Sequence, residues 1–211
     1  PWVYLETNST GNLNLLDQCR ATGVPKFVLA STSSLYGNTE RPFREDAQTD
    51  SPISPDAASK KAAEVMCYTY HVMYGLDVSV LRFFTVYGPA GRPDMSVFRF
   101  TKWIREGLPL GLNGDGSQER DFTYVDDITQ GCVAATERAD GYNIYNLGGG
   151  RTVKVIETIR LIEKELGKTA KIDYLPRQHG DVSLTSADVT RARKDLDYNP
   201  STPVEEGLRK F

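Results

Sequence analysis

An apolar strand, a helix and a second apolar strand follow one another in this sequence, and that order constrains the fold most. The first strand is KFVLAST, residues 26–32, and the second lies in DVSVLRFFTVYGP, with mainly apolar residues from Val78 to Phe84. A helix is expected between them at about residues 55–74. A crossover of this length joins parallel strands, and a continuous apolar run is typical of a strand buried on both faces. The sequence therefore predicts an α/β fold whose ligand site lies at the carboxyl ends of parallel strands.

The segments around this unit extend the same pattern. Upstream, apolar residues at helical spacing stop at Gly23, which suits the end of a helix. Residues 36–55 contain three prolines and many turn-forming residues, so they are expected to form a long surface loop. After Pro89 the sequence predicts a helix, a short strand, a helix, a strand, an amphipathic helix and a final strand. These elements predict a smaller lobe interleaved with the sheet.

Composition narrows the classes of function. The 25 Lys and Arg residues nearly balance the 28 Asp and Glu residues, so no overall field favours nucleic acid or an anionic membrane surface. No apolar run approaches the roughly 18 residues that span a bilayer. Three scattered cysteines, Cys19, Cys67 and Cys132, favour a reducing compartment, so we expect a cytoplasmic protein. Two histidines without clustered cysteines offer no metal site.

Local chemistry explains the acid at the start of the predicted helix without any function. Ser54 can cap the helix, and Pro55 suits its first position. Asp56 then lies in the first turn, where the helix dipole favours a negative charge. Lys60 follows one turn later, so Asp56 and Lys60 can form an ordinary solvated pair. The neighbouring segments give this position a second interpretation.

Four segments together resemble a known family. LASTSSLYG ends a strand with hydroxyl groups, SPDAASK starts a helix, RFFTVYGP ends a strand, and GDGSQERDFTYVDD places an arginine after a glycine turn. In this order and spacing the chain resembles, over essentially its whole length, the extended short-chain dehydrogenases/reductases and, within them, the NAD-dependent nucleotide-sugar epimerases. GRPDM resembles the UDP-glucuronate 4-epimerase branch. The resemblance implies a partial Rossmann-type, doubly wound parallel sheet with a smaller C-terminal α/β substrate-binding lobe.

The resemblance also implies a division of the chain. Residues 1–88 and 123–150 would form part of a dinucleotide-binding domain, and residues 89–122 and 151–211 a nucleotide-sugar-binding lobe. The family's glycine-rich G-x-x-G-x-x-G turn, which holds the NAD pyrophosphate, does not occur before Thr32, and NLGGGRT comes too late in the chain. We therefore expect the first part of the family's fold to be missing from this sequence, and the sheet to have an open strand edge.

The family's Tyr-x-x-x-Lys motif matches Asp56 and Lys60 of this chain. In the family the tyrosine takes the proton from a sugar hydroxyl while the C4 hydride passes to NAD, and the lysine holds the nicotinamide ribose. A strand-end hydroxyl completes the triad; its offset from the following Tyr-Gly places it at Thr32, with Ser33 as the alternative. The contacts to NAD implied by the resemblance come from Lys60, Ser31 and Tyr36.

An aspartate at the tyrosine position changes the chemistry in two ways. A carboxylate on one methylene reaches several ångströms less far than a phenol. An unperturbed aspartate has a pKa near 4 against about 10 for tyrosine, so it is a much weaker base. We therefore expect severely reduced turnover. The alternative is a nucleotide-sugar-binding remnant or pseudoenzyme without redox chemistry.

The resemblance places five residues at the substrate: Ser33, Thr85, Arg92, Arg120 and Arg177. Arg92 of GRPDM could bind a uronate carboxylate, since a guanidinium offers paired donors, or it could be a surface loop arginine. Arg120 could bind the UDP diphosphate, or it could tie the hairpin to Asp126 or Asp127. Arg177 precedes the Gly-Asp of RQHGD, a contact made by many relatives, although the register is not clear.

The residues after Thr32 narrow the reaction. Related sugar dehydratases carry an Asp-Glu pair there, and related decarboxylases carry a glutamate where this chain has Ser34; the chain has Ser33 and Ser34. The resemblance then leaves 4-epimerisation of a UDP-hexose with NAD, the best expectation being UDP-glucuronate and UDP-galacturonate. Relatives commonly dimerise through a four-helix bundle, for which the helices near Pro1 and Pro55 are the candidates.

Overall fold

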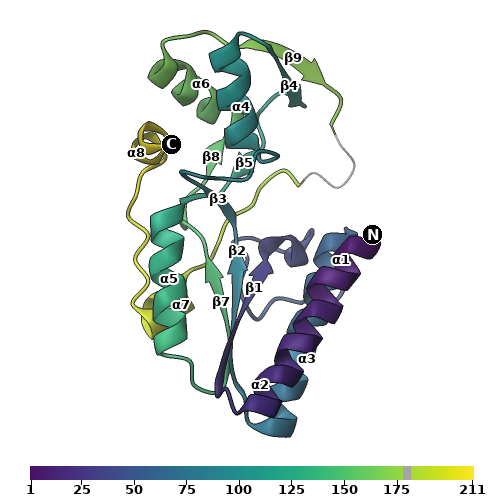
Figure 1. Cartoon of the computed structure of the whole chain (residues 1–211). Coiled ribbons are helices and arrows are strands. Elements are labelled where there is room, and N and C mark those ends of the chain that lie inside the picture. Colours follow the sequence, from purple (N-terminus) through teal and green to yellow (C-terminus); the bar gives the residue numbers. More distant parts are fainter. Residues whose placement is uncertain (178–181) are drawn as a thin grey trace.

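A three-stranded parallel sheet is the centre of the computed structural model, which describes residues 1–177 and 182–211 (Figure 1). Its order is β1 (Lys26–Thr32), β2 (Asp77–Phe83) and β7 (Tyr142–Leu147). Phe83 pairs with Thr32 on one side and with Leu147 on the other, so all three strands end at one edge. The predicted α/β class and parallel strand–helix–strand unit are confirmed.

Helices cover both faces of this sheet (Figure 1). One face packs against α2 (Gly11–Thr22) and α3 (Pro55–Tyr74), through a core that contains Leu16, Cys67 and Val78. The other face packs against α5 (Val125–Glu137) and α7 (Thr190–Leu196). Residues 78–82 of β2 are all buried, as the apolar run predicted. We call the sheet and these helices the sheet lobe.

The chain begins in a helix that changes its winding. α1 (Trp2–Tyr4) continues into the π-helical segment η1 (Leu5–Thr10) and then into α2. α2 ends at Gly23 with φ 72°, and α3 ends at Gly75 with φ 69°, a left-handed conformation that glycine adopts at low cost. The stop at Gly23 is confirmed, whereas the apolar spacing did not reveal η1.

A second group of elements forms what we call the small lobe. Its longer elements are α4 (Ser96–Glu106), β4 (Pro109–Asn113), α6 (Val155–Leu166), β9 (Lys171–Leu175) and α8 (Val204–Lys210). Its core includes Ile104, Leu110 and Ile159. β4 and β9 form a parallel pair. Two short pairs lie between the lobes: β3 (Thr85–Tyr87) with β6 (Phe122–Tyr124), and β5 (Glu119–Arg120) with β8 (Val153–Lys154).

The end of the chain contains two helices that the sequence analysis did not predict. The sequence predicted a final strand, which is β9, but two helices of seven residues each follow it. α7 packs against β7, and Leu196 and Tyr198 enter the core of the sheet lobe, so part of 151–211 lies outside the small lobe. Helices this short show too few turns for a clear apolar period.

The outer strand of the sheet has one open side. In the described part of the chain β1 pairs with β2 alone, which leaves its other edge without a strand, as predicted. No helix in residues 1–177 or 182–211 is both long and apolar enough to cross a membrane.

Candidate active site

A pocket of about 500 Å³ lies at the carboxyl ends of the sheet strands. We call it the strand-end pocket. Its lining includes Ser31, Thr32, Asp56, Lys60, Gly88, Arg92 and Met95. β1 supplies the first two residues, α3 the next two, and the segment after β3 the last three. The structure thus brings together the three residues predicted to be catalytic, which are Thr32, Asp56 and Lys60.

The start of α3 is built as the local sequence predicted. Ser54 is the N-cap, with its Oγ accepting a hydrogen bond of 3.2 Å from the backbone N–H of Ala57, and Pro55 is the first helical residue. This cap sets the first turn, so Asp56 and, one turn later, Lys60 face the strand-end pocket. The capping interpretation is therefore confirmed, whereas the active-site interpretation, with which these positions agree, stays a prediction.

Lys60 ties α3 to the end of β1. Its Nζ donates a hydrogen bond of 2.8 Å to the carbonyl oxygen of Ala30. Partial burial lowers the pKa of Lys60, and the nearby charge of Asp56 opposes that shift. The solvated pair predicted between Asp56 and Lys60 is replaced by this anchor, because among the described residues no ion pair joins the two.

The sequence analysis did not identify Asn8, which also contacts the site. Asn8 lies in η1, and its Nδ2 donates a 2.9 Å hydrogen bond to Ser59 Oγ and a 3.5 Å contact to Asp56 Oδ1. The Ser59 hydroxyl in turn donates to the Asp56 carbonyl at 2.7 Å. The sequence around Asn8 gives no sign of these contacts, since its two partners lie about 50 residues away along the chain.

The structure separates the two candidate hydroxyls. Thr32 lines the strand-end pocket and caps the short helix η2 (Ser33–Tyr36), where its Oγ1 accepts a 3.2 Å hydrogen bond from the Ser34 N–H. Ser33 lines a neighbouring pocket of about 200 Å³ together with Ser34 and Ser54. The geometry therefore favours Thr32 over Ser33 as the hydroxyl beside Asp56.

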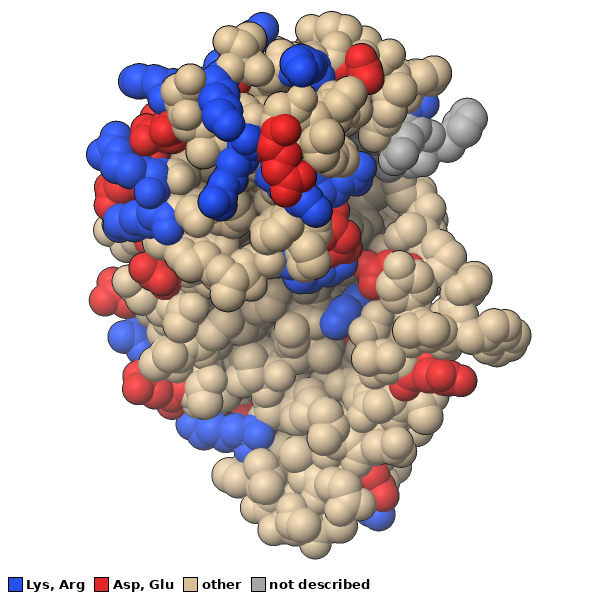
Figure 2. All heavy atoms as spheres, turned by 45° about the horizontal axis from the view of Figure 1, so that its top comes forward, with Lys and Arg blue, Asp and Glu red and all other residues tan. Residues whose placement is uncertain are grey.

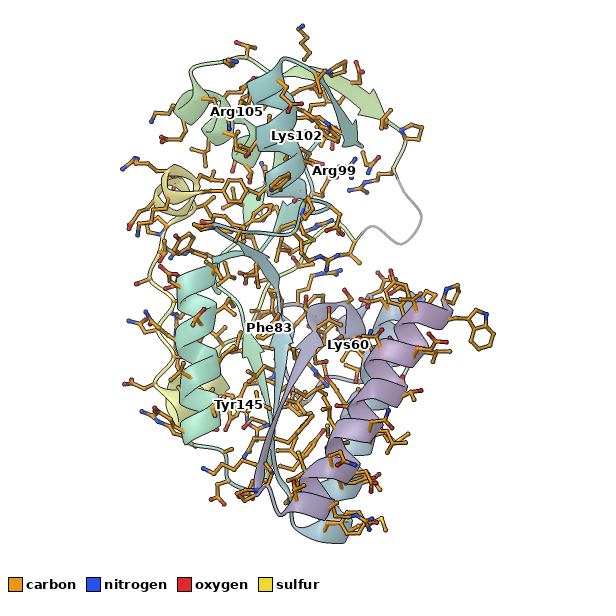
Figure 3. All side chains as sticks on the ribbon, viewed as in Figure 1. Lys60, Phe83, Arg99, Lys102, Arg105 and Tyr145 are labelled. Atoms are coloured by element: carbon orange, nitrogen blue, oxygen red, sulfur yellow. The ribbon has the colours of Figure 1, made fainter. Side chains whose placement is uncertain are left out.

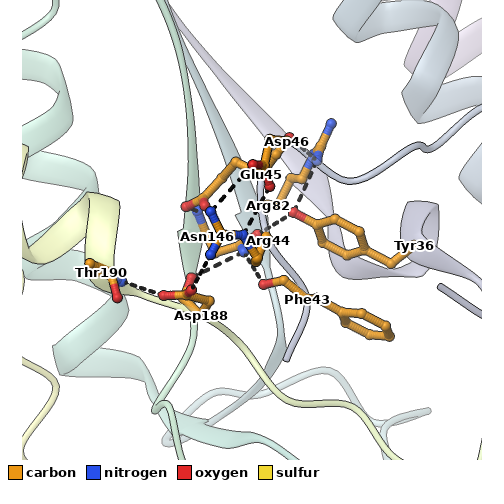
Figure 4. Close-up of polar contacts among 9 residues, drawn as sticks. All are labelled: Tyr36, Phe43, Arg44, Glu45, Asp46, Arg82, Asn146, Asp188 and Thr190. Atoms are coloured by element: carbon orange, nitrogen blue, oxygen red, sulfur yellow. Dashed lines mark hydrogen bonds and ion pairs between the residues drawn. The ribbon is translucent and has the colours of Figure 1, made fainter. Parts of the chain in front are cut away.

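Of the other residues predicted to bind the cofactor, Ser31 borders the strand-end pocket but Tyr36 does not reach it. Ser31 Oγ donates a 2.6 Å hydrogen bond to Glu64. Tyr36 is 1% exposed, and its hydroxyl accepts from Arg82 at 2.9 Å and donates to Asn146 at 2.7 Å (Figure 4). Burial raises the pKa of Tyr36 to about 12. Tyr36 therefore lies outside the lining of the strand-end pocket, because η2 turns the phenol into the core, and its contact with NAD stays a prediction.

A second pocket, of about 420 Å³, lies against the small lobe. We call it the cation-lined pocket. Its lining includes Thr85, Asp94, Met95, Arg99, Asn113, Gln118 and Arg120. Met95 lines both pockets, so they adjoin. Figure 2 shows basic side chains gathered over the small lobe and a hollow between the lobes, and Figure 3 shows Lys60 and Arg99 on opposite sides of that space.

Of the arginines predicted to bind the substrate, Arg120 lines a pocket and Arg177 does not line either of the two pockets. Arg120 lines the cation-lined pocket, and Asp127, offered as its structural partner, instead accepts bonds from the backbone N–H groups of Ser201 and Thr202. Arg177 lies beside the Gly114 turn, outside the pocket lining, and the other residues of RQHGD up to 181 lie outside the described residues.

Two further arginines, Arg92 and Arg99, line the two pockets. Arg92 lines the strand-end pocket, where its Nε and Nη2 hold the two carboxylate oxygens of Asp94 at 3.1 and 2.5 Å. This pairing lowers the pKa of Asp94. Arg99 on α4 was missed by the sequence analysis, because a charged residue on an amphipathic helix resembles any solvated one.

Proteins similar to this chain in sequence include UDP-glucuronate 4-epimerases. The chain is 53% identical over 211 residues to the UDP-glucuronate 4-epimerase of Thermodesulfobacterium geofontis, and 42% identical over 231 residues to UDP-glucuronate 4-epimerase 4 of Arabidopsis thaliana. All of the chain is covered in both comparisons, whereas it spans 65% and 53% of the lengths of those relatives.

The solved structures agree with the sequence relatives. The UDP-glucuronic acid 4-epimerase of Bacillus cereus, solved in complex with UDP-glucuronic acid and NAD, superimposes with a TM-score of 0.91 at 36% identity, covering 96% of this chain and 65% of that one. The profile of the NAD dependent epimerase/dehydratase family matches residues 1–148, which include the strand-end pocket's three predicted catalytic residues. From this match and the fold, the chain belongs to the NAD dependent epimerase/dehydratase family.

Proposed function

We propose that this chain carries the sugar-nucleotide site of an NAD-dependent 4-epimerase that interconverts UDP-glucuronate and UDP-galacturonate. The observation that supports it most is the placement of Thr32, Asp56 and Lys60 around one pocket that adjoins a second, arginine-lined pocket. A sugar in the first pocket and a nucleoside diphosphate in the second would form one continuous ligand. The names of the sequence relatives support the uronate over a neutral hexose.

The described residues fit one end of NAD. Lys60 has three N–H donors and uses one on Ala30, which leaves donors for the hydroxyls of a nicotinamide ribose. Bound NAD would supply the acceptor and donor of the C4 hydride. The chain's own part is to hold the ribose through Lys60 and the sugar hydroxyl near Thr32 and Asp56.

The two pockets divide the substrate contacts. Arg120 and Arg99 provide guanidinium groups for the diphosphate, which suits them because paired N–H donors match phosphate oxygens. Arg92 lies in the strand-end pocket, where it can meet the uronate carboxylate. Thr85 lines the cation-lined pocket together with Arg99 and Arg120, so it can contact the same ligand.

The proposed function includes slow turnover, because Asp56 stands at the position of the family's tyrosine. Its short side chain is held at the helix start by the cap at Ser54 and by the contact with Asn8, so it cannot extend to where a phenol would end. Proton transfer would then need an intervening water. The second candidate, a protein that binds the sugar nucleotide without turnover, is favoured by the same residue.

Replacing Arg120 by alanine is expected to weaken UDP binding about 10- to 100-fold, the range for a lost charge-assisted hydrogen bond. Titration calorimetry with UDP measures it. Arg160→Ala is the matched control, because it removes an arginine that pairs with Glu163 on the surface of α6, outside both pockets. Equal weakening by the two substitutions would contradict a diphosphate site at Arg120.

A test for bound NAD separates the two candidates. Nucleotides are released with acid from the purified protein and separated by chromatography, and the intact mass is measured on the same sample. Stoichiometric NAD together with UDP-sugar affinity would support the epimerase. UDP-sugar affinity without NAD would support the binding protein.

We also propose a homodimer through α2 and α3, in the reducing cytoplasm that three free cysteines suit. α3 exposes an apolar stripe of Val65, Tyr68 and Val72 at helical spacing, and α2, which packs beside it, exposes Leu15. Two such helix pairs from two copies would bury these stripes as a four-helix bundle.

Val65→Glu is expected to convert the dimer to a monomer at micromolar concentration, because it places a charge in the middle of the proposed interface. Light scattering after size-exclusion chromatography gives the mass. Val133→Glu is the control, since Val133 lies on α5 away from the stripe and has the same 52% exposure. An unchanged mass for Val65→Glu would rule out this interface.

A further inference from the structure

The Arg92–Asp94 pair spans the border between the two pockets. Arg92 lines the strand-end pocket, Asp94 lines the cation-lined pocket, and Met95 beside them lines both. The pair is bidentate, with each carboxylate oxygen of Asp94 held by a different nitrogen of Arg92. The Nε–Nη2 edge of the guanidinium, one of its two edges that can hold a carboxylate with paired donors, is therefore already occupied by a carboxylate of the chain.

Asp94 has a second cation within reach. Arg99 follows Asp94 by five residues, in the first turn of α4, and lines the same pocket as Asp94. The charges of both Arg92 and Arg99 lower the pKa of Asp94, with Arg92 making the larger contribution. Asp94 is also 62% exposed, so it can leave Arg92 without losing its hydration.

We propose that Asp94 is a specificity-determining residue: it stands in for the substrate carboxylate on the Nε–Nη2 edge of Arg92, and a uronate must displace it to bind that edge. This inference rests on the proposed function. A neutral sugar such as that of UDP-glucose has no carboxylate for Arg92, so it binds with the pair intact. Asp94 therefore reduces the preference of the site for a uronate over a neutral hexose.

The Arg92–Asp94 pair is exposed, so removing it should change ligand affinity only moderately. Asp94→Asn leaves Arg92 without its carboxylate partner and should raise the ratio of UDP-glucuronate affinity to UDP-glucose affinity about three- to fivefold. The ratio is the informative quantity. Removing a negative charge from the cation-lined pocket also helps any diphosphate to bind, and this general effect is common to both ligands.

The experiment measures the dissociation constants of UDP, UDP-glucose and UDP-glucuronate by titration calorimetry at one ionic strength. The variants are Asp94→Asn, Arg92→Ala and the combination of both. Asp46→Asn is the matched control, because Asp46 forms the same two-residue pair with Arg44, at 3.1 and 3.3 Å, away from both pockets (Figure 4).

Support requires that Asp94→Asn raise the ratio, that it fail to do so when Arg92 is alanine, and that Asp46→Asn leave the ratio unchanged. Equal tightening of both sugars would overturn the inference, since Asp94 would then act only as a nearby charge. A rise that persists with Arg92→Ala would overturn it as well. If UDP itself does not bind, the proposed function fails and the inference with it; if all three ligands bind and the ratio is constant, the inference alone fails.

Discussion

Replacement of Arg82 by methionine is expected to lower the free energy of unfolding by about 3–5 kcal/mol, the cost of leaving one partner of a buried ion pair alone. Arg82 on β2 and Glu64 on α3 are each 2% exposed. Their two hydrogen bonds measure 2.8 and 3.0 Å, and Arg82 also donates to the hydroxyl of Tyr36. The substitution strands the Glu64 carboxylate in the core between helix and sheet. Denaturant unfolding followed by circular dichroism gives the change.

Two further variants separate the stranded charge from lost packing. Replacing both partners, as Arg82→Met with Glu64→Leu, should recover a large part of the loss, because no unpaired charge remains. Arg20→Met should change stability little, since Arg20 pairs with Asp17 on the surface of α2, where each side chain is about half exposed. A double variant as unstable as Arg82→Met alone would show that the pair is not the source of the cost.

Asp56→Tyr is expected to increase the turnover of UDP-glucuronate with NAD by at least about 100-fold, the lower range of a general acid–base contribution. The phenol extends from the capped start of α3 into the strand-end pocket, toward the side that Thr32 and Lys60 line. Conversion to UDP-galacturonate, followed by chromatography, measures the rate. UDP-sugar affinity should change much less than turnover.

The control for the increased turnover of Asp56→Tyr is a substitution that keeps the size of the aspartate. Asp56→Asn retains the reach of the side chain but cannot accept a proton, so it should show no gain. Adding Lys60→Met to Asp56→Tyr should abolish most of the recovered rate, since the anchor to Ala30 and the charge beside the phenol are lost. Turnover that stays at the starting level in Asp56→Tyr, with NAD and substrate bound, would contradict the epimerase proposal.

The predictions from the sequence succeeded where the signal was local. Ser54 and Pro55 begin α3, and Gly23 ends α2, as expected, since caps and stops depend on residues within one or two turns. The mainly apolar run from Val78 to Phe84 predicted a strand buried on both faces, and residues 78–82 of β2 are buried. The short helices α7 and α8 were not predicted, because seven residues are too few to show the apolar spacing of a helix.

The same distinction between local and long-range signals applies to the residues of the candidate site. The sequence determined by itself the parallel α/β architecture and a ligand site at the carboxyl ends of the strands. The resemblance to the family, read from the same sequence, grouped Thr32, Asp56 and Lys60 at that edge. Only the tertiary structure decided the partners across long separations: Tyr36 turned inward to Arg82, and Asn8 placed against Asp56. The directions of these side chains depend on packing between distant segments, which no local pattern encodes.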